Sequence, residues 1–139
     1  MIGIIVATHG KFSKEIIGSA EMIFGKQENV ISVTFEPGES ADGLVDKYKE
    51  AMKELKYEDG LLFFVDLFGG SPYNAASRIV MEEENMDIVT GVSLPMLLEA
   101  FGSKDIVALP ELVEIAMNSA RDAVKSFKAS FSDVEEEEL

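Results

Sequence analysis

Residues 60–72 read GLLFFVDLFGGSP, an apolar run that passes through an aspartate and two glycines into a helix-start signal. Gly60 to Val65 shows no alternation of apolar with polar residues, and this indicates a strand buried on both faces of a sheet. Ser71 followed by Pro72 is typical of a helix start, with Ser71 as the N-cap. A buried strand that leads directly into a helix is the repeating unit of parallel α/β sheets.

The same alternation recurs on both sides of this stretch. Apolar runs predict three further strands, over residues 2–7, 30–35 and 86–92. Helical spacing of apolar residues predicts helices over residues 11–24, 40–55, 71–84, 95–101 and 110–124, the second with Ser40 as its N-cap. We therefore expect an α/β domain with an open, mainly parallel four-stranded sheet flanked by helices and joined by right-handed crossovers.

The C-terminal part of the chain carries two weaker signals. Phe127, Ala129 and Phe131 alternate with polar residues, which predicts a late edge strand whose apolar face needs cover, for example from another subunit. An acidic run follows, and its charge is typical of a solvated tail. We expect a single domain over residues 1–131 and an acidic tail over residues 132–139.

Composition excludes several classes of function. The chain of 139 residues has a formal net charge of −14, which disfavours binding to nucleic acid and to anionic membranes. It contains no cysteine, so disulfides and thiolate chemistry are excluded. No metal-ligand cluster is visible, no signal peptide precedes the first strand, and no segment has the length of a membrane span. We expect a cytoplasmic protein that needs no metal or other cofactor.

The most informative polar residues follow two of the predicted strands. His9, the only histidine, comes after the first strand, and Asp66 comes directly after the third. Ligands of open α/β sheets bind at the carboxyl ends of the strands, where the strand order reverses. If these two strands are neighbours, His9 and Asp66 converge on one site.

This pair has a defined chemistry. A carboxylate that accepts the N–H of a neutral imidazole fixes its tautomer, orients the ring and stabilises the cation formed when the other nitrogen reacts. The turn of Gly69, Gly70 and Ser71 leads into a helix, where unpaired backbone N–H groups and the helix dipole favour a phosphoryl group. We predict His9 as the nucleophile, Asp66 as its orienting partner and the three turn residues as the phosphoryl-binding group.

Two other site types fit the same residues less well. A receiver domain phosphorylated on an aspartate after its third strand needs acidic Mg²⁺ ligands after the first strand, where this chain has only Thr8 and His9. A serine hydrolase needs a nucleophile elbow, which is missing. A shallow site that protein partners can reach is expected instead, and Phe12, Met22 and Phe68 are the residues proposed for its apolar rim.

Three segments resemble one known family over nearly the whole chain: IIVATHGKFS at residues 4–13, DLFGGSPYNAA at 66–76 and TGVSLPMLLEAF at 90–101. The family is the IIA component (EIIA) of the mannose/fructose/sorbose type in the phosphoenolpyruvate-dependent sugar phosphotransferase system (PTS). Ser93 stands where many members carry Asn. The phosphotransfer subunit of dihydroxyacetone kinase is a related alternative, but its aspartate is typically followed by Gly-Ser-Ala.

The resemblance implies a role for each site residue. It implies that His9 is phosphorylated by the histidine phosphocarrier protein, that Asp66 holds the ring, and that the phosphoryl group passes to a separate IIB component. IIB then serves the membrane IIC and IID components, which take up the sugar. The resemblance also implies a homodimer that exchanges a C-terminal edge strand, expected at residues 127–131. A regulatory module that uses the same phosphohistidine is the second alternative.

Overall fold

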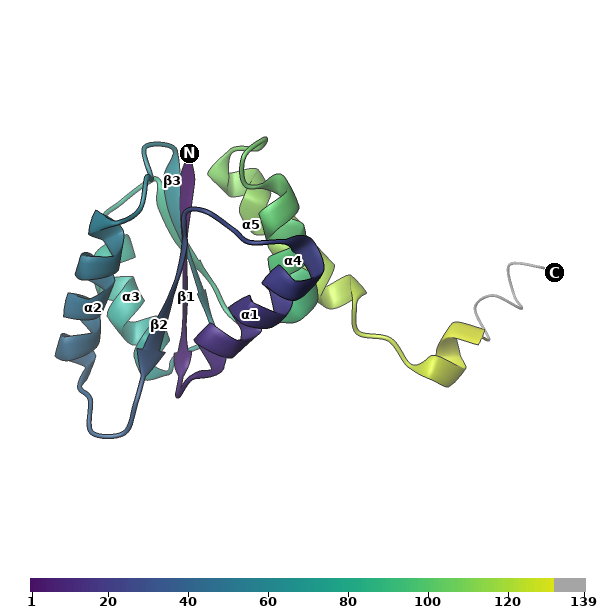
Figure 1. Ribbon diagram of the computed structural model, residues 1–139, viewed down its shortest axis with the longest axis horizontal. Helices are drawn as coiled ribbons and strands as arrows, with labels where there is room; N and C mark the ends of the chain where they lie inside the picture. Colours follow the sequence, from purple (N-terminus) through teal and green to yellow (C-terminus); the bar gives the residue numbers. More distant parts are fainter. Residues whose placement is uncertain (132–139) are drawn as a thin grey trace.

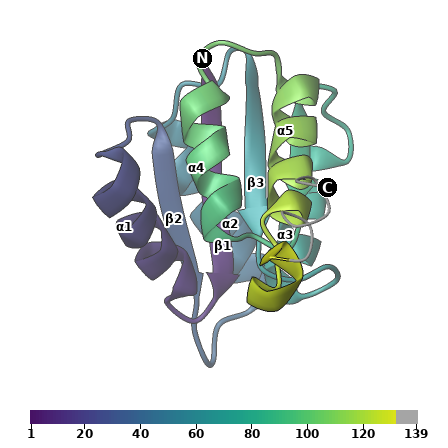
Figure 2. The ribbon, with the colours of Figure 1, turned by 90° about the vertical axis from the view of Figure 1, so that its right-hand side faces the viewer.

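A computed structural model describes residues 1–131 as a parallel sheet with helices on both faces (Figures 1 and 2). The strands are β1 (Ile2–His9), β2 (Val30–Phe35), β3 (Gly60–Val65) and β4 (Met86–Val89). The helices are α1 (Phe12–Phe24), α2 (Ala41–Lys53), α3 (Ser71–Val80), α4 (Leu94–Ser103) and α5 (Leu109–Asp122). The strand order is β2-β1-β3-β4, and every neighbouring pair is parallel. The expected open α/β sheet is confirmed.

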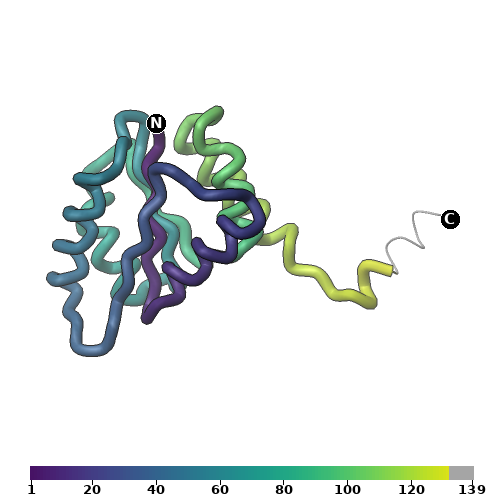
Figure 3. The backbone as a smooth tube through the Cα atoms, in the orientation of Figure 1, coloured from purple at the N-terminus to yellow at the C-terminus, as the bar shows by residue number. Residues whose placement is uncertain are grey.

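The two faces of the sheet bury separate apolar cores. Helices α2 and α3 cover one face, and α1, α4 and α5 cover the other, as the tube in Figure 3 also shows. Side chains of β1 alternate between the cores, with Ile4 and Val6 facing α1, α4 and α5, and Ile5 and Ala7 facing α2 and α3. All four side chains are fully buried. An unbroken apolar run is therefore the consequence of a central strand covered on both sides.

Several element boundaries differ from the predicted ones. β1 runs two residues further than expected and ends at His9, which pairs with Phe35 of β2. β4 ends at Val89 because Gly91, with a φ of +72°, turns the chain out of the strand. α3 ends at Val80, before three glutamates whose charge is unfavourable at a helix C-terminus. Within residues 1–131, no helix combines the length and apolarity that a membrane span requires.

The predicted edge strand over residues 127–131 is wrong for the single chain. These residues form a short helical segment, in which the Ser130 N–H donates to the Ser126 carbonyl at 3.0 Å. The segment projects from the body of the domain (Figure 1), and Phe127 and Phe131 are exposed. Without a neighbouring strand, the backbone satisfies its hydrogen bonds locally. The predicted acidic tail at 132–139 lies outside the described residues.

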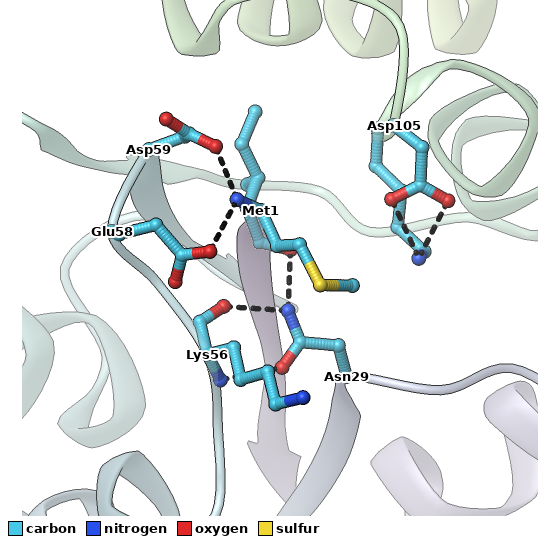
Figure 4. A network of polar contacts seen from close by, with 8 residues as sticks. Met1, Asn29, Lys56, Glu58, Asp59 and Asp105 are labelled. Atoms are coloured by element: carbon cyan, nitrogen blue, oxygen red, sulfur yellow. Dashed lines mark hydrogen bonds and ion pairs between the residues drawn. The ribbon is translucent and has the colours of Figure 1, made fainter.

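A network of polar contacts connects the chain segments at the N-terminal ends of the strands (Figure 4). The Met1 ammonium pairs with the carboxylates of Glu58 and Asp59 in the loop before β3. Asn29, in the left-handed region with a φ of 65°, donates from Nδ2 to the Lys56 carbonyl at 2.6 Å. Its Oδ1 accepts the Lys56 N–H at 2.7 Å. Asn29 Nδ2 also donates to the Ile2 carbonyl at 2.9 Å, so one side chain joins the loops before β2 and β3 to the start of β1.

Tyr48 joins α2 to the start of α3. Its side chain is fully buried, and its hydroxyl donates to the Pro72 carbonyl at 2.8 Å. The ring packs edge-on against Phe63, with centroids 5.1 Å apart. Burial raises the pKa of Tyr48, and the negative charge of Asp66 raises it further. The phenol therefore stays protonated and keeps its hydrogen bond to the helix start.

Replacing Tyr48 by Phe removes that hydrogen bond while leaving the ring in place. We expect Tyr48→Phe to lower the free energy of unfolding by about 1–2 kcal/mol, because a buried hydrogen bond is lost. Urea denaturation followed by circular dichroism measures the change. Tyr57→Phe is the control, since the described residues provide no hydrogen bond to the Tyr57 hydroxyl. Equal stability of the wild-type and Tyr48→Phe chains would contradict this role.

Candidate active site

The site lies where the strand order reverses. β1 is followed by β2 on one side, whereas β3 and β4 lie on its other side. His9 is the last residue of β1, and Asp66 follows β3 directly. Because β1 and β3 are parallel neighbours, their carboxyl ends lie at the same edge of the sheet. The predicted convergence of the two residues is confirmed.

Asp66 binds both the ring and the backbone of His9. His9 Nδ1 lies 2.9 Å from Asp66 Oδ2, and the His9 backbone N–H donates to the same oxygen at 3.1 Å. The second oxygen, Oδ1, accepts the Leu67 N–H at 3.1 Å. A carboxylate can only accept, so the proton of the neutral imidazole is on Nδ1 and the lone pair is on Nε2. The His9 side chain is 45% exposed, whereas that of Asp66 is 17% exposed.

Phe35 and Gly70 also lie against the ring. The rings of His9 and Phe35 meet edge-on, with centroids 5.9 Å apart. Gly10, the residue after His9, has a φ of +60°, and its N–H donates to the Phe35 carbonyl at 2.7 Å. A Cβ on Gly70 would lie 2.9 Å from His9 Cε1, a distance that side chains do not tolerate. Gly70 is therefore required for the ring to sit in this position.

The glycine turn begins α3 in a way that differs from the prediction. Gly70, in an extended conformation, is the N-cap, and Ser71 is the first helical residue, half-buried and not the cap. Asn74 stabilises the turn, because its Nδ2 donates to the Gly69 carbonyl at 3.0 Å and its N–H donates to the Gly70 carbonyl at 2.8 Å. The first N–H groups of α3 and the positive end of its dipole lie beside His9. This arrangement favours an anion.

Of the three residues predicted for the apolar rim, two follow His9 and Asp66 closely in the chain and one does not. Phe12 and Phe68, at the starts of α1 and of the glycine turn, are 46% and 78% exposed. Leu67, which the sequence reasoning missed, is 58% exposed and adjoins Asp66. Met22 lies ten residues along α1 from Phe12, about 15 Å further at the usual helical rise, so the structure does not bring it to the site.

Three other residues of the site had no decisive signal in the sequence. Phe35 reads as an ordinary strand residue, and its position beside His9 depends on the register between β1 and β2. Asn74 lies five residues after Gly69, a spacing that allows its side chain to donate to the Gly69 carbonyl, and this role could have been predicted from the sequence. Thr8 reads as part of a strand end. Among residues 1–131, no cluster of three or more acidic, histidine or cysteine side chains could hold a metal.

Comparisons with known proteins agree on one family. The family "PTS system fructose IIA component" matches residues 3–117. The mannose-specific EIIAB component of Escherichia coli K12 is 43% identical over 129 residues, which are 92% of this chain but 40% of that protein. The fructose-specific EIIA component of Bacillus subtilis is 36% identical and covered over 100% of both chains. The crystal structure of EIIA from Streptococcus agalactiae superposes with a TM-score of 0.84 at 29% identity, over 93% of this chain and 99% of that one.

The close approach of Gly70 to His9 generates a prediction about ring position. We expect Gly70→Ala to push the imidazole away from the turn and weaken the bond from Nδ1 to Asp66. Because His9 is the only histidine, its ring resonances in ¹H–¹⁵N NMR spectra report the change without ambiguity.

Gly18→Ala is the matched control, since a Cβ at Gly18 in α1 meets nothing within 4 Å. It is expected to leave the ring unchanged and to raise stability by about 0.5–1 kcal/mol. Identical His9 spectra in the two variants would show that Gly70 does not constrain the ring.

Proposed function

The chain belongs to the mannose/fructose/sorbose family of PTS IIA components, and from this premise we propose that it is a phosphocarrier with His9 as its phosphorylated residue. In this role it accepts a phosphoryl group from the histidine phosphocarrier protein and passes it to a IIB component. The membrane IIC and IID components are then its indirect partners, and the cytoplasm is its compartment. The observation that carries the proposal is the 2.9 Å contact between His9 Nδ1 and Asp66 Oδ2 on a half-exposed ring.

The first transfer is an in-line displacement at phosphorus. The lone pair of His9 Nε2 attacks the phosphorus carried by the donor's histidine and forms a new N–P bond. The N–P bond to the donor breaks, and its electron pair stays on the donor's nitrogen. The proton on His9 Nδ1 remains in place, and Asp66 stabilises the positive charge that the His9 ring acquires. Transfer to IIB repeats these steps with His9 as the leaving group.

The turn before α3 supplies the electrostatic stabilisation. The phosphoryl group on Nε2 would lie on the Gly70 side of the ring, since a Cβ added at Gly70 would lie 2.9 Å from His9 Cε1 and 3.6 Å from His9 Nε2. The backbone N–H groups of Gly69, Gly70 and Ser71, with the Ser71 hydroxyl, are the proposed partners of the phosphoryl oxygens. No metal is needed in this scheme, because charge is stabilised by backbone dipoles fixed before the reaction.

The exposure of the site suits a protein that serves two partners in turn. A closed cavity would exclude the large donor and acceptor, whereas His9 is half-exposed, and Phe12, Leu67 and Phe68, which closely follow His9 or Asp66 in the chain, are exposed too. Exposed aromatic residues are typical anchors of transient protein interfaces. The same rim can therefore receive both partners. A regulatory module would share the phosphohistidine but would not transfer it onward, and this difference separates the two functions.

The C-terminal segment supports a homodimer. The rings of Phe127 and Phe131 meet edge-on, and both residues are exposed in the single chain, as is Val124. Beside the outer edge of β4 lies a cavity of about 330 Å³, whose lining includes Ile88, Met117 and also Phe68 of the rim, so the exchanged segment would border the rim. In the proposed dimer, residues 127–131 of one subunit extend along this edge of the other and convert to a strand.

The central test is phosphorylation of His9. Incubation with phosphoenolpyruvate, enzyme I and the histidine phosphocarrier should add one acid-labile phosphoryl group to the wild-type chain, seen by intact mass at alkaline pH. His9→Ala should acquire none, because it lacks the only imidazole. Loss of the label on addition of a IIB component distinguishes a carrier from a regulator. Unchanged labelling of His9→Ala would exclude the proposed residue.

Asp66→Asn tests the orienting role. It removes the charge while keeping the side chain's size, so we expect the fold to persist and the transfer rate to fall by about 10²-fold as the ring loses its fixed tautomer. Rapid-quench measurement of phosphoryl transfer gives the rate. Asp46→Asn, an exposed change on α2 away from the site, should retain the wild-type rate. Equal rates in the two variants would remove Asp66 from the mechanism.

Light scattering tests the dimer. At micromolar concentration the full chain should have about twice the mass of one subunit, and a chain that ends at residue 125 should be monomeric because it lacks the exchanged segment. A monomeric full chain would contradict strand exchange.

A further inference from the structure

Two buried hydroxyl groups flank His9 and the turn that leads from it into α1. The buried polar or charged residues of the described chain are Thr8, Ser13 and Lys104. Thr8 precedes His9 in β1, and Ser13 lies in the first turn of α1; both are fully buried. Burying a hydroxyl costs free energy unless it is hydrogen-bonded, and apolar side chains of similar size would fill the same space at no such cost. The hydroxyl of Thr8 therefore calls for a physical reason.

Thr8 Oγ1 uses both its acceptor and its donor. It accepts the Ser13 N–H at 2.7 Å and donates to the His9 carbonyl at 3.2 Å. The N-cap residue of α1, Lys11, makes no side-chain bond to the helix. Thr8 thus satisfies one of the free N–H groups at the start of α1 from the preceding strand. In doing so it connects the helix directly to the backbone of His9.

Hydrogen bonds consequently hold the His9 backbone on both sides. Its N–H donates to Asp66 Oδ2 at 3.1 Å, and its carbonyl accepts from Thr8. The following N–H, that of Gly10, donates to the Phe35 carbonyl at 2.7 Å. The peptide units before and after His9 are both fixed, and the direction of the Cα–Cβ bond is fixed with them. Asp66 can then align a ring whose point of attachment does not move.

We infer that Thr8 is a positioning residue for phosphoryl transfer, acting through the His9 carbonyl to keep Nε2 on the line of attack. The inference rests on the proposed function for its kinetic consequence. Ser13 has a different part, since its hydroxyl donates to the Val33 carbonyl at 2.9 Å and fastens α1 to β2. Its side chain makes no hydrogen bond to His9, which makes it a suitable control.

The kinetic test compares three variants with phosphorylated histidine phosphocarrier as substrate. Thr8→Val should lower kcat by about tenfold or more and change KM by less than about twofold, because the rim that binds the donor is untouched. Thr8→Ser keeps the hydroxyl and should restore kcat to within about threefold. Ser13→Ala removes a buried hydrogen bond of the same cluster and should keep kcat within about twofold of wild type.

The second readout needs no phosphoryl donor. In ¹⁵N NMR spectra of the unphosphorylated chain, the single imidazole should be mainly the Nδ1–H tautomer in the wild type and in Ser13→Ala. Thr8→Val should show a smaller share of this tautomer and broader ring resonances. If the wild type accepts no phosphoryl group, the proposed function fails, but these spectra still decide whether Thr8 positions the ring.

A purely structural role for Thr8 gives a different result. Thr8→Val would then be less stable in urea, with the kcat and ring spectra of the wild type, and this outcome would overturn the inference. If Thr8→Val does not fold, Thr8→Cys takes its place, because a thiol occupies the same site as a weaker donor and acceptor. It should lower kcat by about threefold and broaden the ring resonances; wild-type values of both would again overturn the inference.

Discussion

Parallel pairing between β1 and β3 is the constraint on which the site depends. It brings the ends of two segments 57 residues apart in sequence to one edge of the sheet, where Asp66 receives both the ring and the backbone N–H of His9. An antiparallel arrangement would place these ends on opposite edges. The apolar runs that force both strands into the centre of the sheet thus also determine where the histidine and the aspartate meet.

The site combines an exposed ring with a fixed backbone. The imidazole is open enough for large partners, while hydrogen bonds hold its backbone to Asp66 after β3 and to the Thr8 hydroxyl. The adjoining Gly10 N–H donates to Phe35 of β2, and Thr8 in turn accepts an N–H from the start of α1. Transfer between proteins requires alignment more than it requires a closed cavity, because little other chemistry lowers the barrier. A ring rigidly attached at an open sheet edge is both aligned for transfer and accessible to the partners.

Sequence reasoning succeeded where a single local signal was sufficient. Unbroken apolar runs identified β1 and β3, and the positions of His9 and Asp66 after these two strands predicted their convergence. It failed where the answer depended on neighbours far along the chain. Serine is a preferred N-cap residue, which favoured Ser71. The N-cap is instead Gly70, where the backbone passes close to His9. The alternation at residues 127–131 indicates a strand, yet a strand needs a partner that a single chain does not supply.

The two apolar cores also determine which strands are protected from local unfolding. β1, like β3, pairs with a strand on each side and is covered by helices on both faces, so the amide groups of both strands are shielded from solvent. Segments of this kind exchange their amide hydrogens only in the rare global unfolding events, whereas loops and termini exchange through local fluctuations. His9 ends β1. We therefore expect the reactive residue to be attached to one of the two strands that open only on global unfolding, although its own ring is 45% exposed.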